Sequence, residues 1–252
     1  MLRDLVRRSP FLACVALAAC IDLEKSVTLE KDLSGRASYS LAIDVDQAAR
    51  LSLESGGGRY SRGEAPSKAV LKEAKKRLLH PGGDPADDPF DFDFQLRSLE
   101  KRAPKGVTIR ERKTWDRNPY RGMSFGCAFD RLAELADLAF PSVLGPQLDK
   151  PFGDLRVVDE GGTLLVSDEV VTLFDVRDGK PASPNGPLDW KQAEGRFAGY
   201  RFAWKLTSPL PVVDSNATRH AGDTSTWEVD LGGLKDILDG RKGGKLWARL
   251  RK

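Results

Sequence analysis

Residues that carry out chemistry are scarce in this chain of 252 residues. It contains two histidines, His80 and His220, and three cysteines, and neither type follows the spacing typical of a zinc site. His220 lies between Asp214 and Asp223 in the sequence, which would suit an acid–base pair, but no nucleophile is evident for that pair to serve. We therefore expect no enzyme, no metal and no cofactor. A hydrolase with paired carboxylates is a less favoured alternative, because the spacing of such carboxylates is set in three dimensions.

The first 20 residues, in contrast, have the order of an export signal. Three arginines and one aspartate come first, an apolar run of nine residues from Phe11 to Ala19 follows, and the run ends in small residues. Such a run is far shorter than the roughly 20 residues that span a bilayer as a helix. We expect residues 1–19 to be a signal peptide and residues 20–252 to form a single domain.

The signal ends in a segment that resembles the lipobox of bacterial lipoproteins, Leu17-Ala18-Ala19-Cys20. This resemblance implies cleavage after Ala19 and acylation of Cys20 with several fatty acyl chains, which anchor a protein stably, whereas one chain does so only marginally. It also implies a location in the cell envelope, with the outer membrane favoured where there is one, because Ile21 and not Asp follows the cysteine. A general secretion signal and an uncleaved N-terminal segment are the alternatives. Cys14 fits the pattern less well, because Leu12 stands where a small residue is expected.

Charge and composition limit the partners of the expected mature chain. Removing residues 1–19 lowers the formal net charge from +3 to +1, since that segment carries three arginines and one aspartate. A nearly neutral protein lacks the strong positive field that non-specific nucleic-acid binding requires, so we expect no nucleic-acid partner. Besides Cys20, the mature chain would keep Cys127, whose neighbours at two-residue spacing, Phe125 and Phe129, predict a buried, inert thiol.

Alternating apolar and polar residues predict a fold built from β-hairpins. Hairpins are expected at residues 21–46, 105–130 and 155–174, with further strands at residues 200–206, 226–231 and 245–250. Helical patterns, some with the expected caps Asp46, Ser67 and Asp130, fall at residues 46–54, 68–79, 94–102, 131–140 and 234–238. This order of elements indicates an α+β fold, with a mainly antiparallel sheet on which several helices pack.

The helix expected at residues 68–79 is basic and amphipathic, with Leu71, Ala74 and Leu78 on one side. A helix of this kind either lies on an anionic membrane or presents a solvated outer face while its apolar side packs on a sheet. The second case is far commoner.

The expected mature domain also resembles LppM-type bacterial lipoproteins at its two ends. The matching features are a strand directly after Cys20, the turn Leu33-Ser34-Gly35, and Ser215-Asn216-Ala217 followed by Thr226-Trp227-Glu228-Val229. The resemblance implies an α+β envelope domain and, since a glycolipid-binding role has been proposed for some members, a glycolipid ligand. It fails at residues 245–252, which are short and basic where members of the family often carry an apolar segment.

Two functions are consistent with a membrane-anchored, non-catalytic lipoprotein. In the first, the domain binds a lipid or glycolipid between its sheet and helices. Candidate apolar walls for that pocket are Trp115, Tyr120, Trp190 and Trp204, with Tyr200 and Phe202 beside them. Plain core packing explains each of these aromatic residues more simply. In the second function, the protein is a structural or partner-docking component of the envelope and has no pocket.

Overall fold

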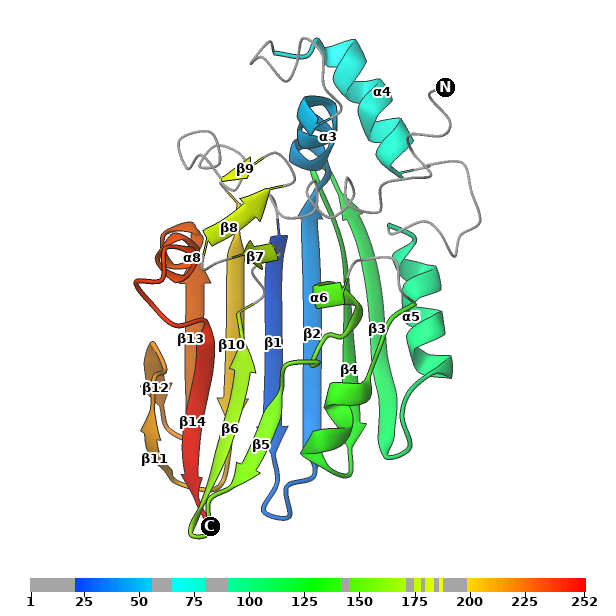
Figure 1. The fold of residues 1–252 in the computed structure, drawn as a ribbon. Coiled ribbons are helices and arrows are strands. Elements are labelled where there is room, and N and C mark those ends of the chain that lie inside the picture. The colour runs from blue at the N-terminus through cyan, green and yellow to red at the C-terminus, as the bar shows by residue number, and fades with distance from the viewer. Residues whose placement is uncertain are drawn as a thin grey trace.

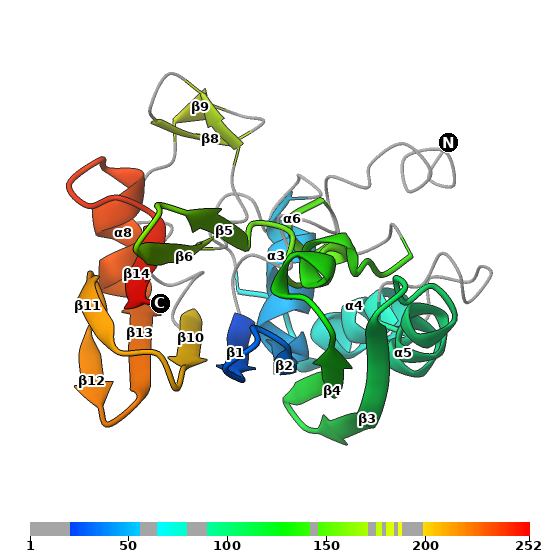
Figure 2. The ribbon, with the colours of Figure 1, turned by 90° about the horizontal axis from the view of Figure 1, so that it is seen from below.

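A computed structural model describes residues 21–55, 65–79, 90–141, 146–170, 175–177, 180–183, 186–187 and 199–252. Two β-sheets lie face to face in this part of the chain, with helices α3 and α4 at one end and α5 at one edge (Figure 1, Figure 2). The predicted α+β class with a mainly antiparallel sheet is confirmed, although the strands divide into more than one sheet.

The larger sheet has seven strands in the order β12-β13-β10-β1-β2-β4-β3. Its strands are β1 (Ile21–Leu29), β2 (Gly35–Asp44), β3 (Val107–Arg117), β4 (Tyr120–Phe129), β10 (Arg201–Thr207), β12 (Arg219–Ala221) and β13 (Thr224–Asp230). The two predicted hairpins, β1–β2 and β3–β4, are confirmed and lie side by side through the pairing of β2 with β4. The central pair, β1 and β10, is parallel, so it joins the N-terminal hairpins to the C-terminal half of the chain.

The smaller sheet has four strands in the order β11-β14-β6-β5. They are β5 (Arg156–Asp159), β6 (Thr163–Glu169), β11 (Val212–Ser215) and β14 (Lys245–Arg251). The predicted third hairpin is therefore present as β5–β6, and the last strand pairs with it. A further sheet of three short strands contains β7 (Asp175–Arg177), β8 (Lys180–Ser183) and β9 (Gly186–Pro187).

The described helices are α3 (Val45–Ser55), α4 (Lys68–Leu79), α5 (Phe92–Lys101), α6 (Pro146–Asp149), α8 (Leu231–Leu238) and the 3₁₀ helix η3 (Leu132–Asp137). The helices predicted at residues 46–54, 68–79 and 94–102 are confirmed within two residues, those predicted at residues 131–140 and 234–238 have different bounds, and α6 was not predicted. Ser67 caps α4 as predicted, since its hydroxyl accepts from the Val70 amide at 3.4 Å.

Two predicted caps are wrong. Helix α3 begins one residue before Asp46, and the Gln47 amide donates to the carboxylate of Asp44 at 3.0 Å, which leaves Asp46 free to pair with Lys75. Asp130 does not cap residues 131–140, because that segment forms only the short 3₁₀ helix, with Arg131 at its N-cap and Glu134 reaching back to the Arg131 amide at 3.2 Å.

The core lies between the two large sheets and under η3 and α6. One aromatic cluster packs Tyr39 against Phe125, with ring centroids 5.6 Å apart, and continues to Phe140 and Phe152. Cys127 belongs to the same core, being 3% exposed, and burial raises the pKa of its thiol to about 11. A thiol with a raised pKa forms little thiolate at neutral pH, so the prediction of a buried, inert Cys127 is confirmed.

The other face of the seven-stranded sheet is open. Figure 2 shows the smaller sheet on one side of the larger one, and in the described part of the chain no helix or strand covers the opposite side. This open face carries small polar side chains on its central strands, and the hydroxyls of Ser26 and Ser38 form a hydrogen bond of 2.7 Å there. Alternation along each strand thus gives one apolar face and one polar face.

Candidate functional site

A shallow groove of about 560 Å³ crosses the open face of the seven-stranded sheet. Its polar lining comes from Glu24 on β1, Ser38 and Ser40 on β2, Glu111 and Lys113 on β3, and Ser124 on β4. The groove therefore offers carboxylates, hydroxyls and an ammonium group within a small area.

The strand register explains how residues so far apart in sequence line this groove. Lys113 lies opposite Ser124, Ser124 opposite Ser40, and Ser40 opposite Glu24, so that one row crosses four strands. Because alternate residues point to the same side of a sheet, the whole row faces the groove. The Lys205 ammonium donates to the Glu24 carboxylate at 2.6 Å and closes the row on the far side. Such an arrangement suits hydrogen bonding to a hydroxyl-rich group.

Ser124 is also the centre of a Gly-x-Ser-x-Gly pattern, Gly122-Met123-Ser124-Phe125-Gly126, a match missed at the level of sequence. Hydrolases place this serine on a sharp turn between a strand and a helix. Here the whole segment lies inside the extended strand β4, and Ser124 makes no hydrogen bond to a histidine in the described residues. The pattern is therefore part of a strand with small residues on its open side, where the groove runs.

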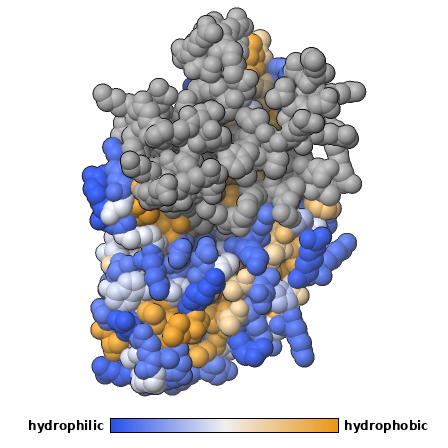
Figure 3. All heavy atoms as spheres, viewed as in Figure 1, coloured by the Kyte–Doolittle hydropathy of each residue, from blue (hydrophilic) through white to orange (hydrophobic). Residues whose placement is uncertain are grey.

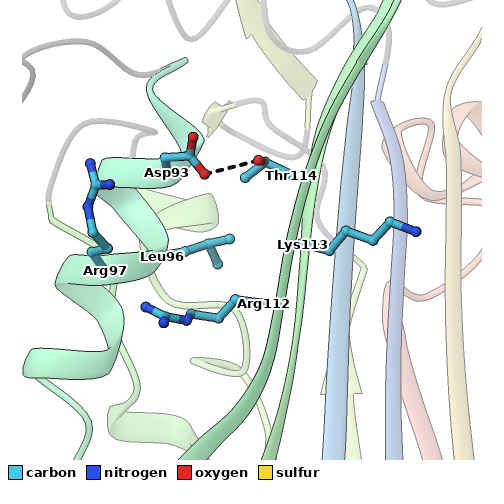
Figure 4. A pocket seen from close by; sticks show the side chains of 6 residues that line it. All are labelled: Asp93, Leu96, Arg97, Arg112, Lys113 and Thr114. Atoms are coloured by element: carbon cyan, nitrogen blue, oxygen red, sulfur yellow. Dashed lines mark hydrogen bonds between the residues drawn. The ribbon is translucent and has the colours of Figure 1, made fainter.

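A second groove, of about 300 Å³, separates helix α5 from the edge strand β3 (Figure 4). The Thr114 hydroxyl donates to Asp93 across it at 3.0 Å. Arg112 is already paired with Glu100 at 2.6 Å, and Lys113 points away toward the other side of β3. The Asp93–Thr114 and Arg112–Glu100 contacts join the helix to the strand, which is typical of a seam between a helix and a sheet.

The predicted wall residues that the structure describes, Trp115, Tyr120 and Trp204, lie on different faces of the larger sheet. Trp204 is fully buried, and its ring stacks on Trp227 with centroids 4.2 Å apart. Trp115 and Tyr120 lie on the open face near the β3–β4 turn, where Trp115 covers Gly122 and Tyr120 is 47% exposed. Trp190 lies outside the described residues, as do Leu17, Ala18, Ala19 and Cys20.

His220 lies on the edge strand β12 and bonds to two serines. Its Nε2 lies 2.8 Å from the Ser215 hydroxyl and its Nδ1 lies 3.0 Å from the Ser225 hydroxyl. His220 does not pair with Asp214 or Asp223, as an acid–base pair would require: Asp214 accepts from Arg249 at 3.3 Å and Asp223 accepts from Thr224. His220 thus links β12 to β13 and to the end of β11.

A buried ion pair between the two sheets was not predicted. The Lys25 ammonium, on β1, donates to both carboxylate oxygens of Asp168, on β6, at 3.1 and 3.3 Å. Lys25 is 1% exposed and Asp168 is 0% exposed. The alternation of Leu23, Lys25 and Val27 on the inward side of β1 is the signal that places Lys25 in the core.

Asn216 explains the Asn–Trp motif noted in the sequence. Its side-chain oxygen accepts from the Trp227 indole at 2.8 Å and from the Trp247 amide at 2.9 Å, and its side-chain nitrogen donates to the Lys245 carbonyl at 2.8 Å. Trp227 belongs to the larger sheet, while Trp247 and Lys245 belong to the smaller one. A single side chain therefore ties the two sheets together.

The described residues define an α+β fold with two facing sheets and a polar groove, an architecture that hosts many functions. No family model and no curated protein matches the sequence. Among solved structures, the chain is similar to the folded domain of the LppM protein of Mycobacterium tuberculosis, determined by NMR, with 12% sequence identity and a TM-score of 0.44. The alignment covers 92% of this chain and 89% of that chain. Separately, no helix in the described ranges is long and apolar enough to cross a membrane.

Proposed function

We propose that this protein is a bacterial envelope lipoprotein, anchored to a membrane by acyl chains on Cys20, and that it binds or docks and does not catalyse. One observation carries the proposal: a basic segment, a nine-residue apolar run and small residues directly before a cysteine. The fold is compatible with such an anchor. β1 begins at Ile21, which is 1% exposed and paired with Ile43, so the sheet starts at the residue bonded to Cys20. The outer membrane is the favoured location where there is one.

Replacing Cys20 with Ser should abolish acylation of the protein. Cells fed with labelled palmitate should incorporate the label into the native chain and into a Cys14→Ser control, since both keep the thiol at the proposed cleavage point. Mass spectrometry of the native protein should find an acylated N-terminal peptide that begins at Cys20. Label incorporated into the Cys20→Ser chain, or acyl groups found on Cys14, would show that the anchor is assigned wrongly.

The ligand that we propose is a lipid or glycolipid held through its polar headgroup. The groove on the open face supports this, because Ser38, Ser40 and Ser124 offer hydroxyls between the carboxylates of Glu24 and Glu111. Buried aromatic side chains such as Trp204 fill the space between the sheets, which favours contact with the headgroup over enclosure of an acyl chain.

Filling the floor of this groove should reduce the ligand that co-purifies with the protein. Gly126 lines the groove, and a Cβ there would meet only the Glu111 side chain, at 3.6 Å, so Gly126→Val adds bulk without a backbone clash. We expect lipid extracted from the native protein to contain a headgroup-bearing species, detected by mass spectrometry, that is lost from Gly126→Val and retained in Thr28→Val. Thr28 lies on the same face but outside the groove. Equal amounts in all three chains, or none in any, would contradict the proposal.

The alternative is a structural or partner-docking component, favoured by exposed apolar side chains on the smaller sheet. Val158 on β5 is 49% exposed and Val213 on β11 is 40% exposed, and these strands form the two edges of that sheet. Figure 3 shows apolar surface interspersed with polar groups on this side of the molecule. Absence of extractable lipid from the purified protein would favour this function.

A further inference from the structure

Helix α4 carries a stripe of three lysines, Lys68, Lys72 and Lys76, that we call the lysine stripe. Residues four apart lie on the same side of a helix, so the three lysines spread over about 80° of the helix surface. All three are exposed, and none forms an ion pair or a hydrogen bond with a residue that the structure describes. The stripe is therefore a set of exposed cations that the described residues leave unpaired.

The other basic residues of α4 are engaged. Lys75 pairs with Asp46 on α3, and its ammonium donates to the side-chain oxygen of Asn118 at 3.1 Å. Arg77 pairs with Glu73 at 3.1 Å. Lys75 and Arg77 thus form the ion pairs of this helix with described residues, and the lysine stripe takes part in none of them.

The inner side of α4 is packed, which fixes the direction of the stripe. Ala74 is buried, and Leu78 and Leu79 pack against the core. Lys75, between them, ties the helix to α3 and to the β3–β4 turn through Asn118. The stripe starts beside Lys75 on the helix and turns away from the packed side, because Lys72 and Lys76 are exposed and lie nearly opposite the buried Ala74.

The same end of the fold holds the start of β1. Ile21 pairs with Ile43, and α3 begins two residues later, at Val45. Figure 1 shows α3 and α4 together at this end, with the β1–β2 turn at the other. An acylated Cys20 would thus place lipid at the end of the domain that carries the lysine stripe.

We propose that the lysine stripe docks on an anionic phospholipid surface and acts as a second membrane contact beside the acyl chains. This inference rests on the proposed anchor at Cys20 for its geometry. The chemistry is that of ammonium groups facing lipid phosphates, where each basic side chain near an anionic leaflet contributes a factor of about five to binding. The docked domain would stand with its strands pointing away from the membrane and its open face along the side.

Vesicle binding by an unacylated chain tests the stripe apart from the anchor. The chain begins at residue 20, carries Cys20→Ser and keeps every described element. It should sediment with vesicles of phosphatidylcholine and phosphatidylglycerol, and not with vesicles of phosphatidylcholine alone, and added salt should release it. Changing Lys68, Lys72 and Lys76 to Gln, which has a similar helix propensity, should weaken binding roughly 10- to 100-fold. The matched control changes three exposed lysines at the opposite end, Lys31, Lys101 and Lys105, to Gln and should bind like the parent.

Amine labelling of the acylated full chain gives a second measurement. On phosphatidylglycerol vesicles, Lys68, Lys72 and Lys76 should be protected from an amine-reactive reagent, while Lys31, Lys101 and Lys105 stay reactive. Equal losses in the two triple variants, or binding unaffected by the stripe variant, would overturn the docking proposal. Neither result would bear on the proposed acylation of Cys20, which the palmitate labelling tests separately.

Discussion

Replacing Lys25 with Met is expected to lower the free energy of unfolding by about 3–5 kcal/mol. The substitution keeps an unbranched side chain of similar length but leaves the carboxylate of Asp168 buried at 0% exposure without its counter-charge. The hydrogen bond that the Glu169 amide donates to that carboxylate, at 2.8 Å, remains. An uncompensated buried charge costs far more than the pair itself contributes, because water no longer solvates it. Urea unfolding followed by tryptophan fluorescence measures the loss.

The double variant Lys25→Met and Asp168→Leu separates this cause from lost packing. Removing both charges should recover most of the stability, since an apolar replacement of a buried ion pair is often neutral or better. The partly exposed pair of Lys205 and Glu24 supplies the control, and Lys205→Gln should cost less than about 1 kcal/mol. A loss below that value for Lys25→Met, or a double variant as unstable as the single one, would mean that the pair is not isolated from water.

The Lys25–Asp168 pair also shows where sequence reasoning reaches its limit. The period-two pattern of β1 is enough to predict the strand and to place residue 25 on its inward side. Its partner lies 143 residues away, on a strand of the other sheet, and nothing local specifies that contact. For the same reason, the hairpins β1–β2 and β3–β4 were predictable, whereas the parallel pairing of β1 with β10 was not.

The candidate groove, too, was predictable only in its local features. Its residues sit at regular alternating positions, so the sequence predicts that Ser38, Ser40 and Ser124 point away from the core. Which strands are neighbours, and hence that Lys113 and Glu24 end one row, depends on the pairing of β2 with β4. The aromatic residues could be recognised in the sequence, but whether they line one site could not be predicted. Trp204 faces the interior, whereas Trp115 faces the open side.

Shortening Trp227 to Ala is expected to lower the free energy of unfolding by about 3–5 kcal/mol, the other large effect in this fold. The side chain is 1% exposed and stacks on Trp204, so its removal leaves a cavity beside a second indole and breaks an aromatic pair. Its indole also donates to Asn216, which in turn holds the Trp247 amide of the smaller sheet. The loss should therefore loosen the contact between sheets as well as the core, and urea unfolding measures it.

A double-mutant cycle resolves the two parts of this effect. Trp227→Phe keeps a ring against Trp204 but removes the indole N–H, and its coupling with Asn216→Ala should be about 1 kcal/mol, the value of one hydrogen bond. Trp115→Ala is the matched control, because that indole lies half-buried on the open face and its loss leaves no enclosed cavity. If Trp227→Ala costs no more than Trp115→Ala, the stacked pair does not bear on stability. Trp204 would then be available to contact a ligand, whereas a tryptophan packed in the core is not.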